Sequence, residues 1–239
     1  MNKRFSGKVA LVAGGTGGLG RAVSLAFLEE GAKVIVTYRE PREWDELKGI
    51  GGANTSSLTG HRIDVTDEKG VEQFVQKVVA EHGHLDVVVN TVGAYAGGAK
   101  LWEMDPKVFD QMLALNLRVG YAILRAVVPP MLKQKNGAII NVASKAAFDH
   151  ASGAAAYAAS KAAAVAMIDS LAADLKGTGV RANSILPSII DTEANRKAIP
   201  KADFAQWPKP EDIARVILFL CSDDAKLIHG AAVPVYGDS

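Results

Sequence analysis

The sequence contains very little cysteine, almost no net charge and no cluster of metal-binding side chains. Its single cysteine, Cys221, lies in an apolar run with no second thiol to pair with, which predicts a buried core thiol in a reducing compartment. The formal net charge is +1, so the composition gives no reason to expect nucleic acid or a membrane surface as a partner. No group of His, Cys and Asp residues has metal-ligand spacing, so we predict no metal site.

A long hydrophobic run is also missing near the start of the chain, where glycines soon interrupt the first apolar stretch. Signal peptides and membrane spans need longer unbroken runs, so we expect neither, and we expect a cytoplasmic protein. Apolar residues make up 49% of the 239 residues, which suffices for a sizeable core. Because no repeat, low-complexity tract or linker divides the chain, we expect one domain over residues 1–239.

Short apolar runs alternate with longer amphipathic ones along the whole chain. The predicted strands cover residues 9–13, 33–37, 61–65, 85–89, 138–142, 181–186 and 231–236. The predicted helices cover residues 21–30, 67–81, a long stretch from about 105, 154–175 and 210–221. This alternation predicts an α/β fold: a doubly wound parallel sheet of Rossmann type, with about seven strands and helices on both faces.

Two stretches do not fit this alternation. Pro129 and Pro130 lie within the long helical pattern and are expected to end or kink that helix. Residues 39–48 carry charges of both signs, and we interpret them as a solvated surface segment.

A glycine-rich turn stands between the first predicted strand and the first predicted helix. Residues 14–20 read Gly-Gly-Thr-Gly-Gly-Leu-Gly. A dinucleotide pyrophosphate needs backbone N–H groups at close range, without Cβ atoms in the way, and gains from the positive end of a helix dipole. A glycine turn in this context supplies both, so we predict a cofactor site here. Its predicted cofactor contacts are Gly14, Thr16, Gly18, Leu19 and Gly20.

The spacing Gly14-x-x-x-Gly18-x-Gly20 resembles that of the short-chain dehydrogenase/reductase family, and further motifs of that family follow in order. Tyr157 and Lys161 lie four residues apart on a predicted helix, which puts them on one face. Ser144 lies thirteen residues before Tyr157, just past the fifth strand. Asn116 lies in an apolar part of the long helix. The resemblance covers essentially the whole chain, and it implies a hydride transfer between a nicotinamide and a carbonyl/alcohol pair.

The chemistry of these four side chains suits that reaction. A free tyrosine has a pKa of about 10 and is a poor base at neutral pH. We expect the Lys161 cation and the positive nicotinamide to lower the pKa of Tyr157, so that it exchanges a proton with the substrate oxygen. The resemblance implies that Ser144 positions this oxygen and that Lys161 also holds the cofactor ribose. It further implies that Asn116 bends its helix slightly and holds a water that relays protons to Lys161.

The end of the second predicted strand should select the cofactor. An acid there would bind the ribose 2′-hydroxyl of NAD and repel the 2′-phosphate of NADP. Tyr38 occupies the position where family members that use NAD carry Asp, and Arg39 follows, whose guanidinium could pair with a phosphate. Glu40 is also at a suitable distance from the glycines to hold a ribose, but we interpret it as pointing away. NADP(H) is therefore the predicted cofactor, with NAD(H) as the alternative.

The resemblance implies further cofactor contacts at the ends of later strands. Residues 90–93 resemble the family's Asn-Asn-Ala-Gly segment, with Thr91 and Val92 departing from it. Residues 183–192 resemble its Asn…Pro-Gly…Thr segment, but Ser188 stands where glycine is usual, which puts the turn geometry in question. The implied contacts are Asp64, Val65, Asn90, Gly93, Tyr157, Lys161, Pro187, Ile190 and Thr192.

The substrate is less well defined by the sequence. A 3-oxoacyl thioester or another small ketone or aldehyde is favoured, but the short segment between Thr192 and Pro208 and the Gly-rich loop 93–98 resemble dihydropteridine reductases. Four side chains are predicted near the mouth of the crevice: Tyr95, Trp102, His150 and Trp207. The resemblance implies a homodimer or homotetramer. A regulator that senses NADP without chemistry remains the alternative from another class, since fold alone does not fix function.

Overall fold

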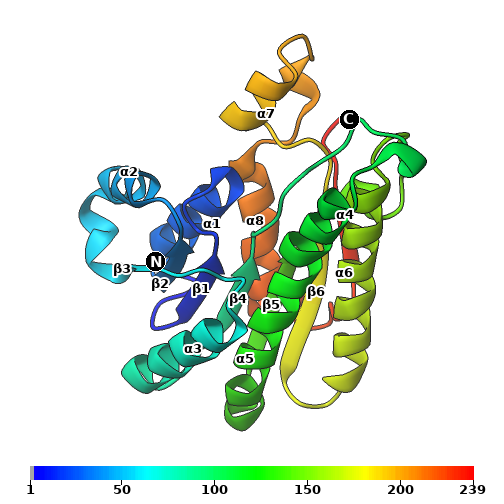
Figure 1. Cartoon of the computed structure of the whole chain (residues 1–239). Coiled ribbons are helices and arrows are strands. Elements are labelled where there is room, and N and C mark those ends of the chain that lie inside the picture. The colour runs from blue at the N-terminus through cyan, green and yellow to red at the C-terminus, as the bar shows by residue number, and fades with distance from the viewer. Residues whose placement is uncertain (1–2) are drawn as a thin grey trace.

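The computed structural model describes residues 3–239, and its centre is one seven-stranded sheet in the order β3-β2-β1-β4-β5-β6-β7. Every neighbouring pair of strands is parallel. The strands are β1 (Val9–Ala13), β2 (Lys33–Tyr38), β3 (Leu58–Arg62), β4 (Val87–Asn90), β5 (Gly137–Val142), β6 (Val180–Pro187) and β7 (Ala232–Val235). The predicted doubly wound α/β fold is confirmed (Figure 1).

Helices cover both faces of the sheet. They are α1 (Gly18–Glu29), α2 (Pro41–Gly51), α3 (Glu68–His82), α4 (Pro106–Leu113), α5 (Val119–Gln134), α6 (Ala155–Asp174), α7 (Glu193–Ala198) and α8 (Pro210–Cys221). One apolar core joins α1, α2 and α8 to the sheet, and a second joins α3, α5 and α6 to it. Along β1 the side chains alternate between the two cores, which is why all five residues of this strand are buried and apolar.

The strand order reverses beside β1. The chain runs from β1 outward to β2 and β3, then returns to place β4 on the other side of β1. The last residues of these two strands, Ala13 and Asn90, are partners in the parallel register. Ligands of open α/β sheets bind beyond the carboxyl ends of the strands at such a reversal. The fold therefore fixes the crevice where the glycine turn and the end of β4 meet.

The third strand begins earlier than predicted. It covers Leu58–Arg62 instead of 61–65, and it pairs with β2 from Val34 through Tyr38. Beyond it, the Asp64 carboxylate accepts hydrogen bonds from the backbone N–H and the hydroxyl of Thr66. This local turn replaces extended pairing, so Asp64 lies past the strand end and does not close the strand.

Most residues of the charged segment 39–48 are exposed, as expected of a surface segment, but the sequence did not predict that residues 41–48 form most of α2. Pro41 stands in the first turn, where its missing N–H costs nothing. Leu47 is fully buried in the core beside α1, and the Trp44 ring stacks on Tyr38 with centroids 5.5 Å apart. These apolar contacts hold a charged segment on the sheet as a helix.

Of the two outcomes expected at Pro129 and Pro130, an end of the helix does not occur, because α5 continues to Gln134. A helical proline leaves the carbonyl four residues earlier without its N–H partner. Those carbonyls belong to Arg125 and Ala126, which lie on the partly exposed side, whereas Val127 and Met131 are fully buried against the sheet. Packing on the buried side therefore maintains the helix.

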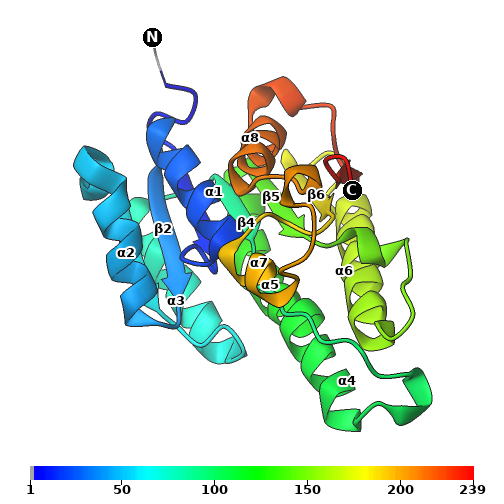
Figure 2. The same cartoon turned by 90° about the horizontal axis from the view of Figure 1, so that it is seen from above.

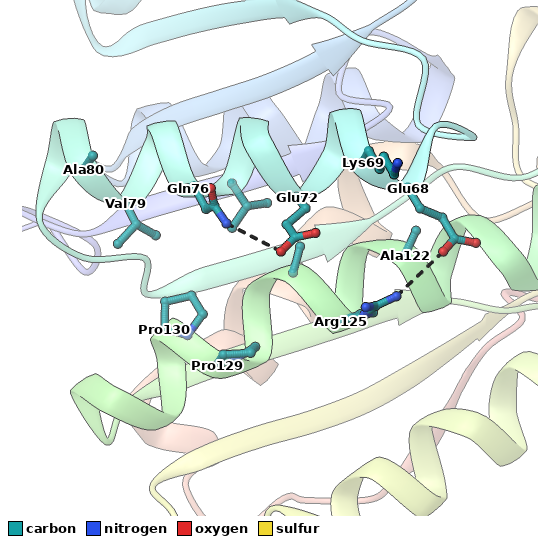
Figure 3. Close-up of a pocket in the computed structure, with 12 residues that line it drawn as sticks. Glu68, Lys69, Glu72, Gln76, Val79, Ala80, Ala122, Arg125, Pro129 and Pro130 are labelled. Atoms are coloured by element: carbon teal, nitrogen blue, oxygen red, sulfur yellow. Dashed lines mark hydrogen bonds and ion pairs between the residues drawn. The ribbon is translucent and has the colours of Figure 1, made fainter.

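The outer side of this helix borders a groove of about 750 Å³ between α3 and α5 (Figure 3). Only residues of these two helices line it, so it contains no strand end and no predicted site residue. The continuous helical stretch Pro106–Gln134 is long and apolar enough to cross a membrane by those two criteria alone. Its residues Val119, Ile123 and Val127 nevertheless pack into the core beneath the sheet, as in core helices of globular domains.

Asp86 joins three segments at the edge of the sheet opposite the crevice. Its carboxylate accepts hydrogen bonds from the Lys8 ammonium at 3.1 Å, the Val9 backbone N–H at 2.9 Å and the Asn136 side-chain amide at 3.2 Å. The Asp86 carboxylate is buried, so these hydrogen bonds replace the water that would otherwise stabilise its charge.

We predict that Asp86→Ala lowers the free energy of unfolding by about 2–3 kcal/mol, because it leaves buried donors without an acceptor. Urea unfolding followed by circular dichroism measures this change. Asp110→Ala, at an exposed position of α4, is the matched control and should change stability by less than about 0.5 kcal/mol. Equal stabilities of the two variants would contradict this role.

Candidate active site

The glycine turn lies directly against the end of β2. The N–H of Gly14 donates to the Thr37 hydroxyl at 3.0 Å, and the N–H of Gly15 donates to the Thr37 carbonyl at 3.2 Å. Gly14 has a φ of +73°, a conformation that favours glycine. A Cβ on Gly20 would collide with the carbonyl oxygen of Gly14. The first turn of α1 is therefore brought against the end of β1 with only backbone at the contact.

This turn fits a nucleotide pyrophosphate. The residue before α1 is Gly17, which has no side chain to cap the helix, and the first turn of α1 contains no acidic residue. The N–H groups of the helix start and the positive end of its dipole thus face the crevice without a competing carboxylate of their own helix. These are the requirements for holding a phosphate anion.

The segment after β6 closes over the turn. A Cβ on Gly18 would lie 2.7 Å from the Thr192 methyl group, so Thr192 is in contact with the glycine turn. Thr192 also caps α7, because its hydroxyl accepts from the Asn195 N–H at 3.2 Å. Both views show α7 above the end of the sheet, over its middle (Figures 1 and 2). This segment is the lid of the site.

The departure from glycine at Ser188 is accommodated. Among residues 3–239 the only non-glycine residue with a positive φ is Lys135, so Ser188 adopts no left-handed conformation. Its hydroxyl donates to the Tyr236 carbonyl at 2.6 Å, which ties the lid to the C-terminal segment.

Asn90 and Thr91 bind together the ends of three strands. The Asn90 amide donates to the Asn141 side-chain oxygen at 3.0 Å, and the Asn90 oxygen accepts from the Val92 N–H at 3.2 Å. Thr91, where the family pattern has asparagine, donates its hydroxyl to the Ala13 carbonyl at 2.7 Å. Threonine at this position therefore adds a hydrogen bond between the end of β4 and the end of β1.

Three of the four predicted catalytic side chains come from elements that converge at the crevice. Ser144 follows β5, and Tyr157 and Lys161 lie one turn apart on α6. The Lys161 side chain is only 5% exposed, and its ammonium donates to the Val142 carbonyl at 3.0 Å. The Lys161 nitrogen lies 5.9 Å from the centre of the Tyr157 ring. The Ser144 hydroxyl acts to lower the pKa of Tyr157, against the effect of burial.

The fourth side chain, Asn116, lies in a π-helical turn that separates α4 from α5. Its oxygen accepts from the Ala94 N–H at 2.8 Å, and its nitrogen donates to the Ala94 carbonyl and to the Ser160 hydroxyl, both at 3.0 Å. The predicted bend is thus a local widening of the helix, and the amide fixes the loop after β4. Ser160 in turn donates to the Tyr157 carbonyl at 2.7 Å, a link that the sequence did not reveal.

Gly93 brings Asn116 and Lys161 together. A Cβ on this residue would lie 2.9 Å from the Asn116 oxygen and 3.0 Å from the Lys161 nitrogen. Glycine at the end of β4 therefore leaves the space that both polar groups occupy.

The protein's own groups raise the pKa of Tyr157, whereas the lowering that we expect also depends on the positive nicotinamide. Burial raises this pKa, hydrogen bonding with Ser144 opposes the shift, and the nearby Tyr95 adds to it. Tyr157 is therefore protonated at neutral pH, the form that donates a proton. Burial also lowers the pKa of Lys161 to about 8, and it raises the pKa of the Cys221 thiol to about 12, as expected of a core thiol.

Of the side chains predicted near the mouth of the crevice, Tyr95 lies beside Tyr157. Its ring meets that of Tyr157 edge-on, with centroids 4.9 Å apart, and Tyr95 is 68% exposed. The loop that carries it is tied to the start of α6 by a hydrogen bond from the Gly98 N–H to the Gly153 carbonyl at 2.9 Å. Trp207 does not line the mouth, because it is buried and packs on Phe204.

At the end of β2, Arg39 extends into solvent. Its side chain is 87% exposed and lies 3.4 Å from the Glu40 carboxylate. Arg62 donates to the Arg39 carbonyl at 3.1 Å and lies next to Tyr38 in the sheet register. Neither Arg62 nor Glu43 was predicted from the sequence as a site residue. Pro41 before an acidic first turn is, however, a recognisable helix start, and it could have located the helix that carries Glu43.

A parallel sheet with a glycine turn at its reversal point defines a nucleotide-binding protein of Rossmann type. The profile of the short chain dehydrogenase family matches residues 8–203. The chain is 33% identical to a 3-oxoacyl-[acyl-carrier-protein] reductase of Thermotoga maritima, covering 98% of both chains. The chain belongs to the short-chain dehydrogenase/reductase family, and it is an NAD(P)(H)-dependent oxidoreductase.

Two solved structures share the fold over almost the whole chain. ElxO with bound NADP has a TM-score of 0.91 and 26% identity, covering 96% of this chain and 97% of its own. NAD+-bound xylitol dehydrogenase has a TM-score of 0.91 and 27% identity, covering 98% of this chain and 100% of its own.

We predict that Lys161→Met stabilises the protein at pH 7 by about 1–2 kcal/mol. Lowering the pKa of Lys161 from 10.5 to about 8 means that burying its charge costs the folded protein about 3 kcal/mol. The variant avoids this cost but loses about 1 kcal/mol with the hydrogen bond to the Val142 carbonyl. Between pH 8 and 10.5 the unfolded chain holds a proton that the folded chain has released, so wild-type stability rises with pH. The advantage of the variant should therefore shrink across that window.

Urea unfolding at pH 7 and at pH 10 measures the gain in stability and its decrease with pH. Lys176→Met, at an exposed position just after α6, is the control and should show neither the gain nor the decrease. A Lys161→Met protein that is less stable than wild type at pH 7 would show that burial of this lysine is not the costly feature we infer.

Proposed function

We propose that this enzyme is an NADP(H)-dependent carbonyl reductase that transfers hydride between the nicotinamide and a carbonyl/alcohol pair. The observation that carries the proposal is the convergence of Ser144, Tyr157 and a buried Lys161 at the same end of the sheet as the glycine turn. The whole chain would act as one nucleotide-binding domain over residues 1–239.

The cofactor would lie along the carboxyl edge of the sheet. When bound, it supplies or accepts the hydride. The backbone of the glycine turn would hold the pyrophosphate, and the lid would cover it through Thr192. The proposed cofactor contacts are Gly14, Thr16, Gly18, Leu19, Gly20, Tyr38, Arg39, Asp64, Val65, Asn90, Gly93, Tyr157, Lys161, Pro187, Ile190 and Thr192.

The protein's own side chains would handle the substrate oxygen. Ser144 donates a hydrogen bond to the carbonyl and orients it toward Tyr157, whose hydroxyl gives its proton to the oxygen as the alcohol forms. Lys161 holds the cofactor ribose and stabilises the phenolate left behind. Asn116 keeps the loop after β4 in place and, through Ser160, positions the turn of α6 that carries Tyr157.

The preference for NADP(H) rests on the end of β2. Tyr38 offers no carboxylate to a ribose, and Arg39 is exposed and available to a 2′-phosphate. The NADP bound to ElxO supports this choice, while the NAD+ bound to xylitol dehydrogenase keeps NAD(H) as the alternative.

A 3-oxoacyl thioester, or another ketone, is the proposed substrate. The similarity to the Thermotoga maritima reductase supports it. A quinonoid dihydropteridine is the second candidate, because α7 contributes only six helical residues to the lid and leaves the site open to a flat ring. We further propose a cytoplasmic homodimer or homotetramer that binds no nucleic acid and no membrane.

We predict that Tyr157→Phe lowers kcat by about 10²–10⁴-fold, because it removes the proton donor and leaves the ring in place. The assay follows NADPH oxidation with a short 3-oxoacyl thioester, and separately with a quinonoid dihydropteridine. The dissociation constant of NADPH should change less than about twofold. Tyr121→Phe, an exposed tyrosine on α5, removes the same hydroxyl elsewhere and should leave kcat unchanged.

Full activity of Tyr157→Phe would rule out the proposed proton transfer. Tight NADPH binding by wild type without turnover of any carbonyl would favour a sensor of the cofactor instead.

We predict that Arg39→Ala weakens NADPH binding about tenfold, through the loss of a charge-assisted contact to the 2′-phosphate, and leaves NADH binding within twofold. Titration of nicotinamide fluorescence measures both constants. Arg118→Ala, which removes an exposed arginine paired with Glu68, is the control for net charge. Equal weakening of both nucleotides would mean that Arg39 does not contact the phosphate.

A further inference from the structure

The hydroxyl of Thr16 in the glycine turn is bonded to a carboxylate from another element. Thr16 donates to the Glu43 carboxylate over 2.7 Å. Thr16 is only 2% exposed, and Glu43 is half-buried in the first turn of α2. The bond joins residues far apart in the chain, and it is the direct polar link between the glycine turn and α2.

The bond lies beside the space that the adenosine ribose of the proposed cofactor would occupy. That ribose occupies the space between the glycine turn and the end of the second strand. The two are in contact, since Gly14 and Gly15 both donate to Thr37. Thr16 is the next residue of the turn, and α2 begins only three residues after β2 ends at Tyr38. The first turn of α2 therefore brings a negative charge to this space.

The neighbouring charges leave Glu43 without compensation by a salt bridge. Arg39 lies beside Glu40, and Arg21 and Arg42 both pair with Glu46 at 3.0 Å. Among residues 3–239, no lysine, arginine or histidine nitrogen lies within 4 Å of the Glu43 carboxylate. Its charge is stabilised here by a neutral hydroxyl.

We propose that Glu43 selects between the two cofactors by opposing the 2′-phosphate, and so limits the preference for NADP(H) over NAD(H). The inference rests on the proposed cofactor site. A 2′-phosphate carries almost two negative charges. It would compete for the Thr16 hydroxyl, and the Glu43 carboxylate that accepts a hydrogen bond from this hydroxyl would repel it. The 2′-hydroxyl of NAD(H) is neutral and can donate a hydrogen bond to the same carboxylate. Arg39 would thus attract the 2′-phosphate, and Glu43 would repel it.

Glu43→Gln separates charge from geometry, because the glutamine oxygen can still accept the Thr16 hydrogen bond. We expect the dissociation constant of NADPH to fall about fivefold at low ionic strength, and that of NADH to change less than twofold. The gain should diminish as salt is added, since screening weakens the repulsion it removes. Nicotinamide fluorescence titrations of both nucleotides, at two salt concentrations, give these numbers.

Asp45→Asn is the matched control. It removes one negative charge from the same helix, but Asp45 is exposed and pairs with Lys48 instead of the glycine turn. An unchanged or weaker NADPH affinity in Glu43→Gln would overturn the proposal, as would an equal gain in Asp45→Asn. These titrations need no turnover, so they are independent of whether the proposed carbonyl substrate is correct. If wild type binds neither nucleotide, the cofactor assignment and this inference both fall.

Discussion

The approach of Gly20 to the carbonyl oxygen of Gly14 is the contact on which the rest of the site depends. It allows α1 to begin directly beyond β1, with only backbone between helix and strand. The helix start then faces the reversal point of the sheet, where the ends of β1 and β4 are register partners. Any side chain at Gly20 would push the helix away from the crevice and remove the dipole and N–H groups from the phosphate position.

Periodicity predicted most of the architecture, because both faces of this sheet are covered and central strands such as β1 are continuous apolar runs. Strand β1 and helix α8 match their predicted bounds. The errors lie where a few tertiary contacts outweigh local character. Trp44 and Leu47 anchor α2 although its composition is that of a solvated segment, and burial of Val127 and Met131 carries α5 past its two prolines.

The residues proposed for the site could be located from motif spacing, but not their interactions. No pattern shows that Asn116 holds Ala94 and Ser160, or that Glu43 reaches Thr16, because each contact joins segments that only the completed sheet brings together. Sequence spacing also contains no measure of how much protein surrounds the Tyr157 ring, and therefore none of the desolvation that raises its pKa.

The hydrogen bond between Gly98 and Gly153 has a mechanical consequence. It joins the loop that carries Tyr95 to the start of the helix that carries Tyr157, and a second link, from Lys100 to Ser152, reinforces it. The proposed proton donor and the loop that would form one wall of the substrate crevice are therefore held together by two hydrogen bonds. Adjustment to substrates of different shape would then fall to the other wall, the short lid after β6, where the proposed enzyme could vary what it accepts without disturbing the alignment of Tyr157.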